Sequence, residues 1–117
     1  MRTDLDVWKK SMYLTEHIYW ATKEYPRIKQ YTIVSQMRRA ALSVPSNIAE
    51  GAARRTTKDY IRFLYIALGS ILELETQCLI SKRLEYCDYS CINDLLNIKR
   101  MLSSLIKSLE SSSKTIT

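Results

Sequence analysis

Apolar residues recur at alternating spacings of three and four positions along most of the chain, and this helical period constrains the fold more than any other feature. Only two glycines and two prolines interrupt the 117 residues, so long helices have few places to end. A helix with an apolar face must bury that face against another element. The sequence therefore predicts an all-α protein, and a chain of this length is expected to form one domain with its own core.

The pattern predicts four helices joined by short connections. Pro26 ends the first helix, because the residue before a proline is pushed away from helical angles. Thr56 and Asp59 form a variant of the capping box, which starts the third helix. Short connections force neighbouring helices to run antiparallel, so residues 1–117 are expected to form an up-down-up-down four-helix bundle. The expected helices span residues 4–24, 29–54, 57–83 and 88–108, followed by a frayed tail at 109–117.

The first and third predicted helices each carry more apolar surface than one bundle seam requires. We expect part of this surplus to meet another subunit, with Ile18 and Leu72 at the contact. In the first helix, one row at helical spacing is Leu5, Trp8, Met12, Thr15, Tyr19 and Thr22, and the row beside it is Val7, Leu14, Ile18, Ala21 and Tyr25. In the third helix, the core row is Tyr60, Phe63, Leu64, Ala67, Ile71, Leu74 and Cys78, and the second flank is Ile61, Tyr65, Leu68, Leu72 and Leu79.

Pro45 lies inside the second predicted helix, within the block SVPSNIAEG. A proline in a helix interior removes one hydrogen bond and costs about 3 kcal/mol. The apolar register nevertheless matches on both sides of Pro45, which predicts one Pro-kinked helix in which the Ala41 carbonyl is freed. The alternative is a break at Ser43, with Pro45 in the first turn of a new helix.

Several polar residues lie within or beside the apolar rows of the second and third helices. Buried polar groups need hydrogen-bond partners. One interpretation is structural: Asn47 and Glu50 satisfy the backbone that Pro45 disturbs, and Glu50 pairs with Arg54. The other is functional: the polar residues line a groove or the central opening of an assembly. The predicted polar cluster is Gln36, Asn47, Glu50, Ser70 and Glu73, with Ser43 beside it.

The sequence contains no pattern typical of a catalytic or metal centre. His17 is the single histidine, and neither a Gly-rich phosphate loop nor a Glu-x-x-His pair is present. Cys78, Cys87 and Cys91 form no C-x-x-C pair, so neither zinc nor a disulfide framework is indicated. We therefore predict a protein that is not an enzyme, with no cofactor and no metal. A reducing cytoplasm fits this cysteine usage, and no export signal or membrane span is expected.

The basic residues point to an anionic partner. The formal net charge is +6 and the pI is about 9.3, a balance that favours nucleic acid. Four of these residues lie near the junction of the second and third helices, where Tyr60 and Tyr65 could stack on bases. The alternative interpretation is a solvated helix face. The predicted nucleic-acid-binding residues are Arg38, Arg39, Arg54, Arg55, Lys58 and Arg62.

The run SQMRRAALSVPSNIAEGAARRTTKDYIRFLYIALGSILELETQCLISKRL resembles the bacterial four-helix-bundle proteins encoded in intervening sequences of 23S ribosomal RNA genes, the S23-like proteins. The similarity begins at DVWKKSMYLTEHIY, and SVPSNIAEG, ARRTTKDYIRFL and ALGSILELETQ are its most specific parts. Many members carry an acidic residue after the proline of the first loop, where this chain has Arg27, Ile28 and Lys29. The resemblance implies a four-helix bundle that assembles into a homo-oligomeric ring, a pentamer, without catalytic activity.

A group related to this family, the accessory variability proteins of diversity-generating retroelements, resembles the same barrel. That likeness implies a protein that brings reverse transcriptase and RNA together through a basic surface. Two function classes remain open from the sequence. One is a nucleic-acid-binding or scaffold protein, and the other is a purely structural oligomer whose partner is another protein.

Overall fold

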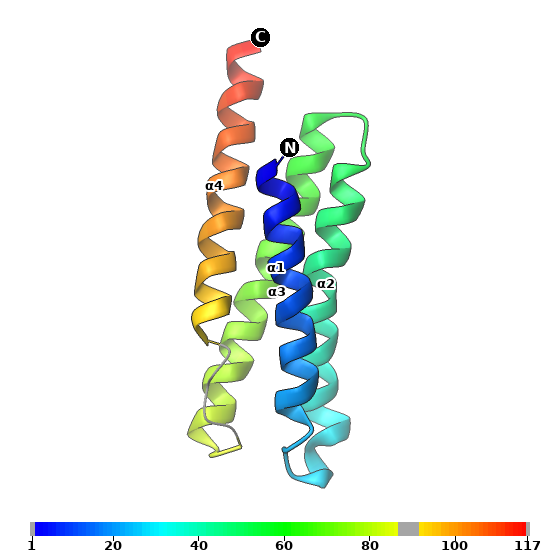
Figure 1. Ribbon diagram of the computed structural model, residues 1–117, viewed down its shortest axis with the longest axis vertical. Helices are drawn as coiled ribbons and strands as arrows, with labels where there is room; N and C mark the ends of the chain where they lie inside the picture. Colours follow the sequence, from blue (N-terminus) through cyan, green and yellow to red (C-terminus); the bar gives the residue numbers. More distant parts are fainter. Residues whose placement is uncertain (1, 87–91, 117) are drawn as a thin grey trace.

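The computed structural model describes residues 2–86 and 92–116, which form four long helices packed side by side (Figure 1). The molecule measures 53 × 21 × 19 Å along its principal axes. α1 and α3 each contact both α2 and α4, so α1 and α3 lie on a diagonal of the bundle. The predicted all-α four-helix bundle is confirmed. The helices are α1 (Arg2–Thr22), α2 (Ser35–Ala52), α3 (Thr57–Arg83) and α4 (Ile92–Ile116).

The helix ends differ from the predicted ones at the connections. A 3₁₀ turn, η1 (Arg27–Lys29), and a π-helical segment, η2 (Gln30–Val34), occupy the start of the second predicted helix. α4 continues to Ile116, where a frayed tail was predicted after residue 108, because no glycine or proline stops it. The predicted start of the fourth helix at residues 88–91 lies outside the described residues, as do Cys87 and Cys91.

The core lies along the axis between the four helices. In α1, the row that contains Val7, Leu14 and Ile18 is buried there, and the side chain of Ile18 is 0% exposed. The expectation that Ile18 meets another subunit is therefore wrong. Leu5 and Met12 of the other row are exposed at the surface instead. Both rows repeat at helical spacing in the sequence, and the direction in which the neighbouring helices pack decides which row becomes core.

The two apolar rows of α3 differ in burial, as predicted. The row from Leu64 to Cys78 is buried, whereas Tyr65, Leu72 and Leu79 of the second flank are exposed. α3 is also the one helix in the described part of the chain that is long and apolar enough to cross a membrane. Length and composition alone support that possibility, and a core helix of a bundle meets the same test.

α2 runs unbroken through Pro45, so the predicted continuity is confirmed and the alternative break at Ser43 is wrong. The Ala41 carbonyl, which lacks the N–H of residue 45, lies 3.0 Å from Thr15 Oγ1 of α1, and it shares the single proton of this hydroxyl with the Ser11 carbonyl at 2.8 Å. A partner on another helix thus replaces the bond that proline removes. A bend of α2 at Pro45 stays a prediction.

Side chains of α2 also support the two carbonyls that follow Ala41. Ser46 Oγ donates to the Leu42 carbonyl at 2.9 Å, and Asn47 Nδ2 donates to the Ser43 carbonyl at 2.8 Å. The residues that follow Pro45 therefore strengthen the helix on its C-terminal side. This arrangement gives a physical reason for the polar sequence PSN in an otherwise apolar helix.

Thr15→Val is expected to lower the free energy of unfolding by about 1 kcal/mol, because valine keeps the shape of threonine but leaves the Ala41 carbonyl without a donor. In a Pro45→Ala background, the new N–H of residue 45 can supply that bond, so the same change should cost much less. Urea denaturation of the four proteins measures this coupling. Equal losses in both backgrounds would show that the Thr15 hydroxyl acts only through its bond of 2.8 Å to the Ser11 carbonyl.

Candidate nucleic-acid interface and the polar groove

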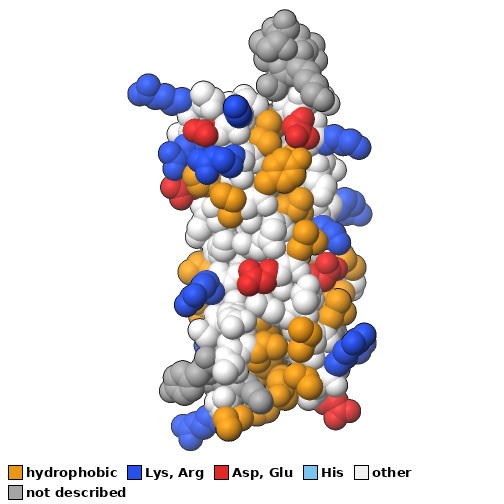
Figure 2. Space-filling view, turned by 180° about the vertical axis from the view of Figure 1, so that it is seen from behind, with side chains coloured by type: hydrophobic (Ala, Val, Ile, Leu, Met, Phe, Trp, Pro, Cys, Tyr) orange, Lys and Arg blue, Asp and Glu red, His pale blue; other side chains and the backbone are white. Residues whose placement is uncertain are grey.

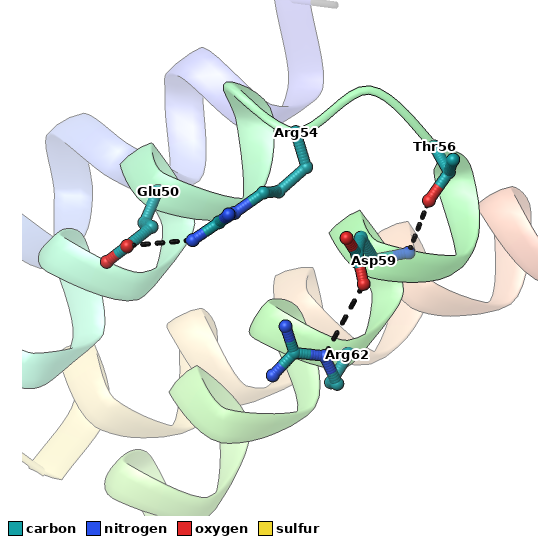
Figure 3. A network of polar contacts seen from close by, with 5 residues as sticks. All are labelled: Glu50, Arg54, Thr56, Asp59 and Arg62. Atoms are coloured by element: carbon teal, nitrogen blue, oxygen red, sulfur yellow. Dashed lines mark hydrogen bonds and ion pairs between the residues drawn. The ribbon is translucent and has the colours of Figure 1, made fainter.

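The connection between α2 and α3 positions four basic residues, Arg54, Arg55, Lys58 and Arg62, which we call the basic cluster. α2 ends at Ala52, and α3 begins at Thr57. Thr56 caps α3, because its Oγ1 accepts a hydrogen bond of 3.1 Å from the Asp59 N–H (Figure 3). The capping residue predicted from the sequence is thus confirmed.

Gly51 allows α2 and α3 to approach closely beside this connection. A Cβ atom at this position would lie 2.7 Å from Phe63 Cβ and 2.9 Å from Tyr60 Cδ1. Only a residue without a side chain fits there. The glycine of SVPSNIAEG therefore brings the end of α2 against the first turns of α3 and fixes the geometry of the basic cluster.

Two members of the basic cluster are held by neighbouring side chains. Arg54 Nη2 lies 2.9 Å from Glu50 Oε1, and Arg62 Nε lies 3.6 Å from Asp59 Oδ1 (Figure 3). Both guanidinium groups also lie over the Phe63 ring, at 4.6 Å and 4.5 Å from its centroid. A phosphate would compete with these carboxylates, so Arg54 and Arg62 are the weaker phosphate ligands of the four.

The other two members present their charge to solvent. Arg55 and Lys58 are exposed, and neither makes a hydrogen bond or ion pair with any residue that the structure describes. Lys and Arg side chains gather near the end of the bundle where α2 and α3 are joined (Figure 2). Arg55 and Lys58 are therefore the residues best placed to meet an anion.

The tyrosines beside the basic cluster are engaged within the bundle. Tyr60 Oη donates a hydrogen bond of 2.7 Å to Asp4 Oδ2, which ties α3 to α1. Burial, together with this bond to a carboxylate, raises the pKa of Tyr60 well above its usual range, so the hydroxyl stays protonated. Burial raises the pKa of Asp4, but the bond from Tyr60 is among the contacts that outweigh it, and the net pKa is lowered. Tyr65 is exposed and lies 3.2 Å from Glu110 of α4.

Arg38 lies far from the basic cluster. Its guanidinium donates to Thr22 Oγ1 at 2.9 Å and to the Tyr19 carbonyl at 3.2 Å, and it lies 4.8 Å from the centre of the Tyr19 ring. These contacts cap the C-terminal end of α1. Arg38 and Arg54 are sixteen residues apart, which corresponds to about 24 Å along a helix. The structure therefore does not bring Arg38 together with the basic cluster.

The predicted polar cluster is divided along the surface between α2 and α3. Ser70 Oγ donates to Ser43 Oγ at 2.9 Å, and Asn47 Nδ2 reaches the same Ser43 oxygen at 2.9 Å. A groove of about 480 Å³ lies next to this chain of hydrogen bonds. Glu50 lies outside it, beside the basic cluster. The groove is lined by Gln36, Arg39, Ala40, Ser43, Ser70 and Glu73.

A second cavity, of about 320 Å³, continues from this groove towards the end of α3. Gln36 lines both cavities. Gln77 was missed in the sequence, although a glutamine beside the buried Leu74 and Cys78 positions is a visible signal. The cavity is lined by Thr32, Ile33, Gln36, Gln77, Ile80, Leu84 and Tyr86.

The described part of the chain contains no group of three His, Cys, Asp or Glu side chains that could hold a metal ion. His17 Nδ1 lies 3.6 Å from Asp94 Oδ2, a contact between α1 and α4 at the surface. Cys78 is buried in the core. His17 and Cys78 thus take part in the packing of the helices against one another.

Comparisons with known proteins place these features in context. The family described as 23S rRNA-intervening sequence protein matches residues 3–108 of the chain. A crystal structure of a protein with unknown function from the S23 ribosomal protein family of Bacteroides thetaiotaomicron is similar, with a TM-score of 0.83 and 28% sequence identity. The similarity covers 90% of this chain and 98% of that one. No match is found among curated proteins.

Proposed function

The chain belongs to the 23S rRNA-intervening sequence protein family, as the resemblance in the sequence predicted, and we propose that it is a non-enzymatic, cytoplasmic protein that binds RNA through the basic cluster. The observation that carries this proposal is the contrast within the cluster. Arg54 and Arg62 are paired with carboxylates, whereas Arg55 and Lys58 have no partner among the described residues. Two unpaired cations on a fixed helix–helix connection form a contact point for phosphate groups.

Two cations bind a polyanion weakly, so the proposal includes repetition of the cluster around a homo-oligomer. The exposed apolar residues of α1 and α3 support association of copies, and the family resemblance suggests five of them. Linked contacts raise the apparent affinity through effective concentration, without any new interaction. Binding of this kind reads the phosphate backbone and depends little on sequence.

A protein partner is the second candidate. The groove between α2 and α3 carries Arg39 and Glu73, charges of both signs, which suits a protein surface better than a polyanion. This candidate includes the scaffold role. The role of an accessory protein that brings reverse transcriptase and RNA together requires RNA binding as well, so it belongs with the first candidate. The RNA-binding measurement below separates the two candidates.

Wild-type protein is expected to retain structured RNA in a filter-binding assay, with affinity falling by an order of magnitude or more between about 50 and 200 mM salt if several phosphates are neutralised. Arg55→Ala with Lys58→Ala should weaken binding and reduce the salt slope by about 2 per contacting subunit. The matched variant, Arg54→Ala with Arg62→Ala, removes the same charge but should change the slope less, because Glu50 and Asp59 already neutralise these groups.

Light scattering on each variant must first show an unchanged oligomer mass. If the two double variants change the salt slope equally, net charge rather than the unpaired residues governs binding. If wild type binds no RNA even at low salt, the RNA proposal is wrong and the protein-partner candidate replaces it.

A further inference from the structure

An apolar pocket of about 450 Å³ lies between the start of α1 and the end of α2. Leu5 and Trp8 line it on the side of α1, and the exposed residues Ala49 and Ala52 line it on the side of α2. Ile48, a residue of the core, lines it as well. Alanine side chains are small, so they leave room beside the indole ring. The pocket therefore fits an apolar group of a ligand.

The charge in this pocket restricts which group can enter. Asp4 is the charged residue among the described residues that line it, and its Oδ2 accepts the hydrogen bond from Tyr60. Burial raises the pKa of Asp4, but its other contacts outweigh this effect, so the carboxyl is ionised at neutral pH. A negative charge in the wall repels phosphates and carboxylates. The part of a ligand that enters is therefore not anionic.

The basic cluster lies beside the pocket. The start of α1 and the connection between α2 and α3 are at the same end of the bundle (Figure 1). Arg55 follows Ala52 by three residues, which limits the distance between their Cα atoms to about 11 Å. Lys58 precedes Tyr60, the partner of Asp4, by two residues. The cations that are best placed to meet phosphates are thus neighbours of a pocket that rejects phosphates.

α1 supplies another cation on its own side of the pocket. Lys9 follows Leu5 by one helical turn, so the two residues lie on the same side of α1. Lys9 is exposed, and it has no ion-pair partner among the described residues. A nucleic-acid strand carries one phosphate for each nucleotide. A strand that contacts both Lys9 and Arg55 therefore passes over the pocket with the base of a nucleotide between these two cations.

A nucleobase meets the requirements of the pocket. It is uncharged and flat, and every base has a face that can stack on an aromatic side chain such as Trp8. In a duplex these faces are covered by the neighbouring base pairs. In single strands, loops and bulges the bases can leave the stack. The pocket is therefore suited to an unpaired base and not to a base pair.

We propose that this pocket receives one unstacked base of a single-stranded RNA segment, which stacks on Trp8 while Lys9 and Arg55 hold phosphates on either side. The inference rests on the proposed function and adds that the RNA is bound at an unpaired segment. Because the contact is made to the face of the base and not to its edge, the four bases should bind with similar affinity. A duplex should bind more weakly, through its phosphates alone.

The two tryptophans of the chain make this contact observable. In a Trp20→Phe protein, Trp8 is the sole tryptophan. A short single-stranded RNA should quench its fluorescence, because the base stacks on the indole ring. The same strand annealed to its complement should quench it much less at equal saturation of the protein. Inorganic polyphosphate, which carries charge but no base, should bind without quenching.

Ala49→Leu tests the pocket without removing any contact of the subunit. Ala49 is an exposed residue within α2, and leucine is a good helix former, so the variant should fold. Its affinity for single-stranded RNA should fall about 5-fold or more, which corresponds to one lost base stack. Its affinity for polyphosphate should stay the same. Ala53→Leu adds the same side chain next to Arg54, away from the described lining of the pocket, and should change neither affinity.

The outcomes separate this inference from the proposed function. Equal affinities for strand and duplex, without quenching of Trp8, would overturn the inference and leave RNA binding by the basic cluster standing. If the protein binds neither RNA nor polyphosphate but adenosine quenches Trp8, the proposed function is wrong and the pocket stands. If adenosine does not quench Trp8 in that case, both are wrong. A changed oligomer mass of Ala49→Leu would show that a neighbouring copy fills the pocket, which would also overturn the inference.

Discussion

Ile18→Asp is expected to abolish folding, whereas Leu72→Asp is expected to leave a folded subunit that no longer associates. The Ile18 side chain is 0% exposed in the core of the bundle. An unpaired carboxylate there has no partner to offset its loss of water, at a cost of about 3–5 kcal/mol or more, out of about 5–15 kcal/mol of total stability. Leu72 is 43% exposed, so a carboxylate at that position stays hydrated in the free subunit.

Circular dichroism and light scattering measure these two outcomes. Ile18→Asp should lose its helical signal, and Leu72→Asp should keep the signal with the mass of one subunit. An oligomer of unchanged mass for Leu72→Asp would remove the exposed face of α3 from the association surface. A folded Ile18→Asp protein would mean that the core tolerates a charge where α1 meets its neighbours.

Gly51→Ala is expected to lower the free energy of unfolding by about 1–3 kcal/mol, the usual cost of overpacking. In the interior of most helices, replacing glycine by alanine stabilises the protein by about 1 kcal/mol. Here the new Cβ would stand 2.7 Å from Phe63 Cβ, an atom fixed to the α3 backbone, and 3.3 Å from the Tyr60 carbonyl oxygen. This steric clash can be removed only if α2 and α3 move apart at the basic cluster. RNA binding should therefore weaken as well.

Gly69→Ala is the matched control for Gly51→Ala. A Cβ atom at residue 69 meets nothing within 4 Å, so alanine should raise the free energy of unfolding of the subunit by about 0.5–1 kcal/mol. Both changes are best measured by urea denaturation in the Leu72→Asp protein, where association does not contribute to stability. Changes of the same sign and size would show that α2 and α3 can separate at Gly51 without cost.

Much of the fold follows from local features of the sequence. The 3–4 spacing of apolar residues, the scarcity of glycine and proline, and the cap at Thr56 are decided within a few residues of chain. They predicted the four helices and the up-down-up-down order. The matched register on both sides of Pro45 predicted that α2 continues through it. Helix formation depends on bonds between residues three or four apart, so a sequence alone can reveal it.

Only the tertiary structure decided which apolar rows are buried and which partners the polar side chains have. Both apolar rows of α1 have the same period, and only the packing of α2 and α4 buries Ile18 and exposes Met12. Arg38 and Arg54 each begin a pair of arginines, and the sequence alone does not distinguish them. In the structure, Arg38 caps α1 at the Tyr19 carbonyl, whereas Arg54 pairs with Glu50. Burial and pairing depend on distances between residues far apart in the chain, and helical periodicity carries no information about those distances.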